Sequence, residues 1–275
     1  RHSKNGRDLM SSKQSIYFYN RKKQDQWEIP ESLVTLGRNH NFKKVQDSKD
    51  ANIIVSIGED GDFLQAVRKS NFRSDCLYAG ISASGNLNMY CDFSIDDHDK
   101  MISAITESRL EVRKYPVIEV SIDDQPPFYC LNELSIRSSI IKTFVIDVFI
   151  DHLHFETFSG DGLVISTPTG STGYNKSVNG AVVDPSLPCY QVSELASLNN
   201  NSYRTLGSSF VLSTRRKLTL RINDPRNSYP IIGLDNEAFN SHHIEKIEIK
   251  LSKKVIKTVK LKDNSYWEKV KRTFL

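Results

Sequence analysis

The chain has 275 residues, of which 38% are hydrophobic and 25% charged, and its formal net charge is +4. This length exceeds one typical compact core and predicts two domains. The mild charge, with no dense basic run interleaved with aromatic residues, excludes a dedicated nucleic-acid binder, and no apolar run approaches the ~20 residues of a membrane span.

The amino-terminal residues, RHSKNGR, are polar and basic, and no apolar segment follows that would make them a secretory signal. We expect a basic tail over residues 1–14, with Met10 as a candidate native start. The four cysteines are widely separated and form no CxxC pair, which predicts no zinc site and favours a reducing, cytoplasmic setting.

Residues 15–109 alternate between strand and helix character. A helix is expected over Asp62–Lys69, where Phe63, Ala66 and Val67 have helical spacing, and a second helix is expected to open with a capping box at Ser94. Buried strands are expected at Ser15–Tyr19, Ala51–Ile57 and Cys76–Ile81. Strands that alternate with helices predict a parallel sheet.

Residues 110–262 show a different pattern, in which apolar residues alternate with polar ones at period two. This pattern, interrupted by turn-forming groups such as DDQPP at 123–127, predicts antiparallel strands packed on one face. The basic residues of 250–262 are assigned to the solvated faces of strands. Residues 263–275, which include YWEKVKR, are expected to form a helix that returns to the first domain.

Two acidic motifs follow predicted strands. The first is Gly58-Glu59-Asp60-Gly61, in which an acid flanked by glycines is suited to accept the proton of an attacking hydroxyl group. The alternative is that Asp60 holds its own turn through side-chain to backbone bonds. The second motif is Asn132-Glu133, which combines an amide and a carboxylate for binding the base and ribose of a nucleotide. Neighbouring side chains meet one ligand only where a strand ends or bulges.

The segment STPTGSTGY at 166–174 follows the sequence GDG at 160–162 and a short apolar run. Its hydroxyl groups donate and accept hydrogen bonds, and its glycines let backbone amides approach a ligand closely. Composition alone is equally consistent with an ordinary polar loop between strands.

These three motifs, in this order and spacing over roughly residues 15–275, resemble the signature of the NAD kinase family. The resemblance implies a Rossmann-like α/β domain with a parallel sheet over residues 15–109 and an antiparallel β-sandwich domain over 110–262. It also implies transfer of the γ-phosphoryl group of ATP to the adenosine ribose 2′-hydroxyl of NAD, with Mg²⁺ or another divalent metal, by a homodimer or homotetramer.

The same resemblance assigns roles to individual residues. It makes Asp60 the general base and lets Gly61 approach the nucleotide closely, while Asn132 and Glu133 bind NAD. Gly233-Leu234-Asp235 corresponds to a further turn at the site. The remaining residues that the resemblance implies in nucleotide binding are Asp161, Thr169, Thr172, Gly173, Tyr174, Asn175, Lys176 and Ser177.

The chain departs from the family pattern at Glu59, Asp62, Asn88-Met89 and Gly173. Glu59 and Asp62 add two carboxylates beside an expected polyphosphate, and these are expected to weaken ATP binding by repulsion. They keep open the alternative of a catalytically weak NAD(H)-binding regulatory protein. A second alternative is a lipid or sugar kinase of the wider superfamily that shares a similar glycine-rich loop.

Overall fold

The structure is a computed structural model that describes residues 14–20, 31–140, 142–223, 229–239 and 243–275. The chain divides into two compact units, of which unit 1 comprises the residues up to Lys114 together with 256–275, and unit 2 comprises 115–255. Strands β6 (Leu110–Ile122) and β17 (Lys246–Leu261) contribute residues to both units. The expected basic tail, with Met10, lies outside the described residues except for Gln14.

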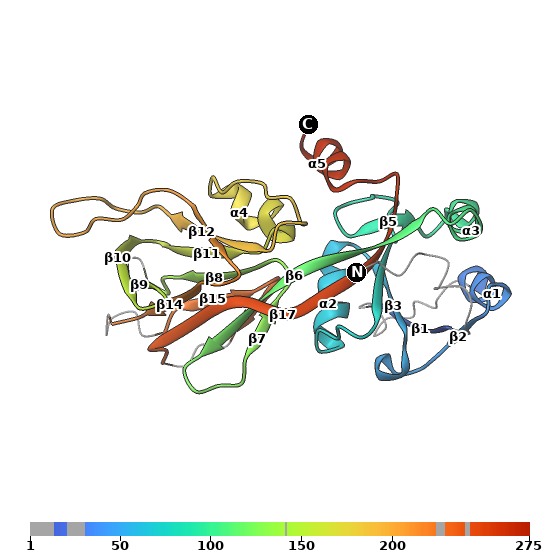
Figure 1. Ribbon diagram of the computed structural model, residues 1–275, viewed down its shortest axis with the longest axis horizontal. Coiled ribbons are helices and arrows are strands. Elements are labelled where there is room, and N and C mark those ends of the chain that lie inside the picture. The colour runs from blue at the N-terminus through green and yellow to red at the C-terminus, as the bar shows by residue number, and fades with distance from the viewer. Residues whose placement is uncertain (1–13, 21–30, 141, 224–228, 240–242) are drawn as a thin grey trace. The chain divides into compact units, whose positions relative to one another are not determined.

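Unit 1 contains the parallel sheet that the sequence predicts (Figure 1). Its strands pair in the order β5-β4-β3-β1-β2, all parallel, and the end of β17 joins β4 through Thr258 and Tyr78. The strands are β1 (Gln14–Tyr19), β2 (Phe42–Lys44), β3 (Ile53–Gly58), β4 (Leu77–Ser82) and β5 (Cys91–Ser94).

Helices cover both faces of this sheet. Helices α1 (Glu31–Asn39) and α3 (His98–Thr106) pack with Val55 and its neighbours in one apolar cluster. Helix α2 (Asp60–Lys69) lies on the other face, because its Phe63 contacts the ring of Tyr78, and successive strand residues point to opposite faces. A 3₁₀ turn at Ser48–Asp50 precedes β3.

The capping box expected at Ser94 is wrong. Ser94 is the last residue of β5, and α3 begins four residues later at His98 after Asp97, whose side chain makes no capping bond. The helix expected over 62–69 is confirmed in α2. The carboxy-terminal helix is α5 (Tyr266–Phe274), which belongs to unit 1 and begins with a capping box between Ser265 and Glu268.

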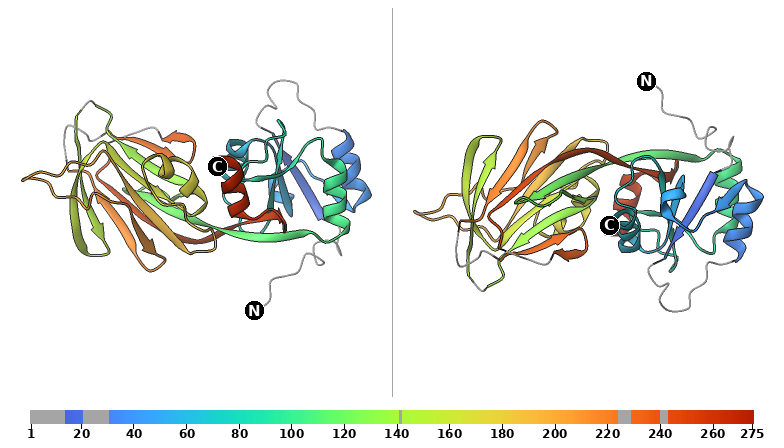
Figure 2. Two further views of the ribbon diagram at one scale, coloured as in Figure 1. Left: turned by 90° about the horizontal axis from the view of Figure 1, so that it is seen from above. Right: turned by 90° about the horizontal axis from the view of Figure 1, so that it is seen from below.

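Unit 2 is a β-sandwich of antiparallel strands (Figure 2). One sheet has the order β13-β12-β11-β8-β15-β16, and the other includes β10-β9-β14-β17, with β7 pairing to β6. The further strands are β7 (Phe128–Cys130), β8 (Glu133–Arg137), β9 (Phe144–Ile150), β10 (Leu153–Gly160), β11 (Gly162–Ser166), β12 (Cys189–Leu195), β13 (Phe210–Ser213), β14 (Lys217–Arg221), β15 (Ile231–Leu234) and β16 (Glu237–Phe239).

Alternating apolar residues from both sheets form the core of unit 2. Phe144 of β9 and Leu163 of β11 are fully buried in the same cluster, as the period-two pattern predicts. Strands β7 and β8 are separated by Leu131 and Asn132, which lie between them. Among the residues that the structure describes, no helix combines the length and apolarity that a bilayer crossing needs.

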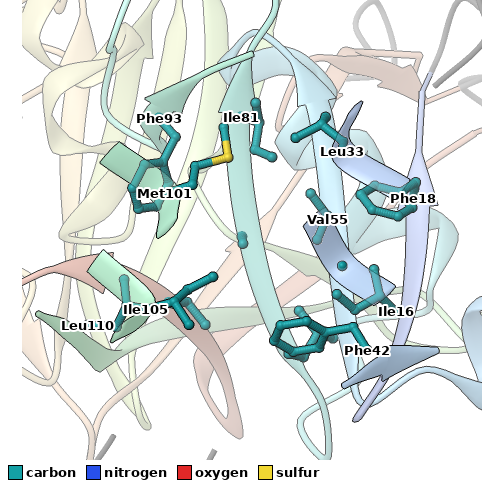
Figure 3. A pocket seen from close by; sticks show the side chains of 14 residues that line it. Ile16, Phe18, Leu33, Phe42, Val55, Ile81, Phe93, Met101, Ile105 and Leu110 are labelled. Atoms are coloured by element: carbon teal, nitrogen blue, oxygen red, sulfur yellow. The ribbon is translucent and has the colours of Figure 1, made fainter. Parts of the chain in front are cut away.

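An apolar cavity of about 140 Å³ lies inside unit 1 between the sheet and helices α1 and α3 (Figure 3). Its lining includes Phe18, Val55 and Phe93 from three strands and Met101 from α3. A cavity without polar partners does not suit a charged nucleotide. It is a packing feature of the α/β unit and is distinct from the polar motifs described below.

Filling this cavity should stabilise the protein. We expect Val55→Ile, which adds one methylene toward the cavity, to increase the free energy of unfolding by about 1 kcal/mol and to raise the thermal midpoint by about 2–4 °C. The control is Val67→Ile in α2, where Val67 is fully buried and does not line the cavity. Calorimetric scans in which Val55→Ile is no more stable than Val67→Ile would contradict this interpretation.

Candidate active site

Asp60 is the first residue of α2 and directly follows β3 and Glu59. Its two carboxylate oxygens accept hydrogen bonds from the backbone amides of Met89, at 2.9 Å, and Tyr90, at 2.8 Å. Burial raises the pKa of Asp60 above its usual value, while both amides, together with the charges of two lysines, act to lower it. The carboxylate is therefore held in a fixed orientation, and Gly61 lies beside it in the first turn of the helix.

Asp62 supports the start of the same helix. Its Oδ2 atom accepts the backbone N–H of Glu59 at 2.8 Å, which satisfies a donor that the helix itself leaves unpaired. The side chain lies so close to Gly58 that a Cβ atom there would be 2.2 Å from Oδ2, and Gly58 has a φ of 147°. Glycine is therefore required at position 58 on both steric and conformational grounds.

Glu59 also has partners within the protein. Its carboxylate accepts hydrogen bonds from Ser84 Oγ at 2.6 Å and from Asn88 Nδ2 at 3.2 Å. Glu59 and Asn88 both depart from the family pattern, and they depart from it as a hydrogen-bonded pair. The two side chains that are expected to repel phosphate thus bind protein donors in the loop and helix around Asp60.

A separate group of candidate residues lies in unit 2, where Asn132 precedes β8 and Glu133 begins it. Both residues lie at the end of a strand, as the sequence predicts. The Asp235 carboxylate binds the backbone at this position. It accepts the backbone amides of Leu131 at 3.2 Å, Asn132 at 2.7 Å and Glu133 at 3.2 Å. The turn at Gly233-Leu234-Asp235 thus fixes the backbone of the Asn132-Glu133 motif.

The Glu133 side chain carries a buried carboxylate oxygen. Its Oε2 atom is enclosed and has no hydrogen-bond partner among the described residues. Burial, followed by the nearby Asp235 carboxylate, raises the pKa of Glu133 to about 8. A Cβ atom on Gly173 would be 3.4 Å from this oxygen. The segment after β11, residues 167–177, which we call the hydroxyl-rich segment, therefore approaches Glu133 closely. An enclosed acceptor without a partner is costly unless a ligand donates to it.

Two threonine side chains of the hydroxyl-rich segment bind the backbone of the residues before β8. Thr167 Oγ1 and Thr169 Oγ1 both donate to the Leu131 carbonyl, the latter at 3.0 Å. A Cβ atom on Gly170 would lie 2.1 Å from the Asn132 carbonyl oxygen, so this approach requires glycine. Asn175 is fully buried and donates to the Ser171 carbonyl at 3.2 Å. Thr169 and Asn175 were expected to bind nucleotide, and both use these polar atoms within the protein.

The other residues of the segment are nearer the surface. Gly173, Lys176 and Ser177 are exposed, Tyr174 is partly buried, and Thr172 is 9% exposed. Helix α4 (Tyr174–Ser177) follows a 3₁₀ turn at Thr169–Thr172. Tyr174 also lines a surface pocket of about 340 Å³ together with Gly233 and Asp235. The structure thus brings Asn132, Glu133 and this segment together.

Asp161 lies away from this group. Strand β11 pairs with β8 so that Ser166 is opposite Glu133 and Gly162 is opposite Arg137. Asp161, which immediately precedes Gly162, is therefore at the other end of β11, with its side chain exposed. It is not brought together with Asn132 and Glu133 within unit 2, and Asp60 and Gly61 belong to unit 1.

Three buried charged residues near Asp60 were not recognised from the sequence. Lys260 was assigned to a solvated strand face, which is wrong because it is completely buried, as are Asp92 and Lys269 to within 1%. The spacing of apolar residues in the sequence of β17 and α5 could have indicated that both lysines face inward. Lys260 continues the inward-facing positions of Ile256 and Thr258 in β17, and Lys269 follows buried Tyr266 by three residues in α5.

The chain is a two-domain protein in which an α/β unit is followed by a β-sandwich unit, and each unit carries partly buried carboxylates near its strand ends. Residues 131–261 match the family model of the ATP-NAD kinase C-terminal domain. The chain is 64% identical to NAD kinase 2 of Bacillus subtilis over 267 residues, covering 97% of this chain and all of that protein. It is 60% identical to NAD kinase 2 of Geobacillus kaustophilus, covering 94% and 97%.

The chain belongs to the NAD kinase family. Solved structures with the same fold include a yeast NADH kinase complexed with NADH, at a TM-score of 0.74 and 17% identity, covering 94% of this chain and 87% of that one. An NAD kinase from Archaeoglobus fulgidus in complex with ATP has a TM-score of 0.70 and 21% identity, covering 94% and 96%. The predicted two-part fold class is confirmed.

Proposed function

We infer that this chain is an ATP-dependent NAD kinase that phosphorylates the adenosine ribose 2′-hydroxyl of NAD and produces NADP. The observation that carries this inference is the 64% identity to a NAD kinase over essentially the whole of both chains. Identity at this level favours NAD phosphorylation over a lipid or sugar kinase and over a purely regulatory NAD(H)-binding protein. The test is NADP formation by the purified protein from NAD and ATP with Mg²⁺.

Asp60 is the general base in this reaction. Its carboxylate takes the proton of the 2′-hydroxyl as that oxygen forms a bond to the γ-phosphorus, while the bond from the γ-phosphorus to ADP breaks. The orientation of Asp60 by two amides, together with burial that raises its pKa, supports this role. Gly61, which has no side chain, permits a close approach of the nucleotide.

NAD binds through Asn132, Glu133 and the surface residues of the neighbouring segment. The partnerless Oε2 of Glu133 accepts a hydrogen bond from a ribose hydroxyl or an amine of NAD. Thr169 and Asn175 contribute by fixing the segment, while Thr172, Gly173, Tyr174, Lys176 and Ser177 contact the dinucleotide. Asp161 contributes to nucleotide binding from the opposite end of β11.

The divalent cation arrives with ATP as part of the substrate. No cluster of three His, Cys, Asp or Glu side chains suited to a metal occurs among the described residues. The carboxylates of Glu59, Asp60 and Asp62 all accept hydrogen bonds from protein donors. Mg²⁺ typically keeps several waters and binds substrate phosphates with few protein ligands, which is consistent with this arrangement.

The enzyme acts in the cytoplasm as a homodimer or homotetramer formed through unit 2. All four cysteines are free thiols, as expected in a reducing compartment. Leu198, Leu206 and Val211 are exposed apolar side chains of unit 2, and Val211 lies on β13, an edge strand. Exposed apolar groups at a sheet edge favour association with another chain.

Asp60→Asn should lower turnover by roughly 10²–10⁴-fold, because the amide cannot accept the hydroxyl proton, and should change NAD affinity far less. The matched control is Asp62→Asn, which retains an oxygen acceptor for the Glu59 amide and should keep turnover within about threefold of wild type. Both are measured as initial rates of NADP formation. A turnover near that of wild type in Asp60→Asn would remove Asp60 from the role of base.

NAD affinity should rise with pH. Glu133, whose pKa is raised to about 8, is mostly protonated at pH 7 and becomes a stronger acceptor for NAD donors when it loses that proton. The dissociation constant should therefore fall by up to about tenfold per pH unit below pH 8 and level off above it.

The measurement is calorimetric titration of NAD from pH 6 to 9 in the absence of ATP. Glu133→Gln, which cannot ionise, should bind NAD more weakly and with an affinity independent of pH over this range. An affinity that instead falls as the pH rises through 8 would mean that Glu133 binds NAD as a neutral acid and donates its proton.

A further inference from the structure

A cluster of three charged side chains lies in the interior of unit 1. Lys260 near the end of β17 is 0% exposed, and Lys269 of α5 and Asp92 of β5 are each 1% exposed. Asp92 contacts Lys269 directly, lies 3.5 Å from the Lys260 ammonium, and accepts the Leu261 amide at 2.7 Å. Although burial acts to raise it, the two lysines hold the pKa of Asp92 below its usual value.

Both lysines also donate to backbone carbonyls in the loop before β5. The Lys269 ammonium donates to the Met89 carbonyl at 3.1 Å, and the Lys260 ammonium donates to the Tyr90 carbonyl. These are the same two residues whose amides bind the Asp60 carboxylate. The loop is thus held on one side by Asp60 and on the other by the lysines.

One peptide group connects Lys269 to Asp60 directly. The Met89 carbonyl and the Tyr90 N–H belong to the same planar peptide, in which the carbonyl accepts from Lys269 and the N–H donates to Asp60 Oδ1. An ammonium on the carbonyl polarises the peptide and makes its N–H a stronger donor. The planarity of the peptide also means that fixing the carbonyl fixes the direction of the N–H.

We propose that Lys269, supported by Lys260 and Asp92, positions the Asp60 carboxylate and keeps it ionised through the Met89–Tyr90 peptide. Lys269 is a positioning residue that acts without touching the substrate. The proposal rests on the proposed function of Asp60 as the general base.

Burial lowers the pKa of Lys269 to about 7, so this side chain carries its charge at the acidic pH values where the ionisation of Asp60 is tested. Lys260 and Lys269 act through space to lower the pKa of Asp60 against the effect of burial. The neighbouring Cys91 thiol stays protonated, because burial, followed by the Asp60 charge, raises its pKa to about 12. Glu59, the other carboxylate beside Cys91, accepts hydrogen bonds from Ser84 and Asn88.

The test compares Lys269→Met with Lys269→Arg. Loss of the ammonium should raise the pKa of Asp60, so that the rise of kcat with pH moves upward by about one pH unit or more. At pH values below the pKa of Asp60, kcat should fall by about tenfold for each pH unit of this shift, with little change in KM for NAD. Lys269→Arg retains the charge and should restore part of the lost activity and return the pH profile toward that of wild type.

The matched control is Arg272→Met. Arg272 belongs to the same helix and donates to the carbonyl of Leu87 in the same loop, but it does not reach the Met89–Tyr90 peptide. Its loss should leave the pH profile in place. A second variant, Lys269→Met with Asp92→Asn, removes one cation and one anion of the cluster and so keeps its formal charge the same as in the wild type. Thermal unfolding together with NAD titration reports that each variant is folded.

The outcomes separate this proposal from the proposed function. If folded Lys269→Met and the double variant keep the wild-type pH profile and kcat while Asp60→Asn is inactive, Lys269 does not position the base. If Arg272→Met shifts the profile as far as Lys269→Met, the effect belongs to the loop as a whole and the specific role of Lys269 is overturned. If Asp60→Asn itself retains turnover, the assignment of Asp60 as the base fails.

Discussion

Hydrogen bonds from backbone amides to carboxylates hold the candidate residues in each of the two units. Asp60 accepts two amides of one loop, and Asp235 accepts three successive amides before and at the start of β8. Such charge-assisted bonds are stronger than neutral ones and fix direction as well as distance. Asp60 thereby fixes the backbone of the loop before β5. Asp235 likewise fixes the backbone at the start of β8.

The residues that depart from the family pattern take part in hydrogen bonds of the same kind. Asp62 binds the Glu59 amide, and Glu59 binds Ser84 and Asn88, so the unusual residues link the start of α2 to the loop that orients Asp60. Hydrogen bonds from protein donors stabilise a carboxylate in its charged form and fix its direction. The residues that depart from the family pattern therefore connect the start of α2 to the loop that binds the Asp60 carboxylate.

The sequence predicted the fold class and the motifs because their signals are local. Strand periodicity, helical spacing in α2 and the motif order required no knowledge of distant contacts. The errors are positions where a local pattern competes with tertiary structure. Ser94 matches a capping box but pairs in β5, and Lys260 matches a solvated face but meets Asp92 and the Tyr90 carbonyl far away in the chain. Long-range partners of this kind leave little trace in a single sequence.

The buried cluster of Asp92, Lys260 and Lys269 is not explained by stability alone, since a well-packed apolar cluster commonly stabilises a core as much or more. Apolar side chains of similar volume would fill the same space, but they would leave the carbonyls of Met89 and Tyr90 without these donors. An ammonium carries three donors, so each lysine can bind a carbonyl and face Asp92 at once. The cluster therefore fixes the orientation of the Met89–Tyr90 peptide, and through it the direction of the Tyr90 amide that Asp60 accepts.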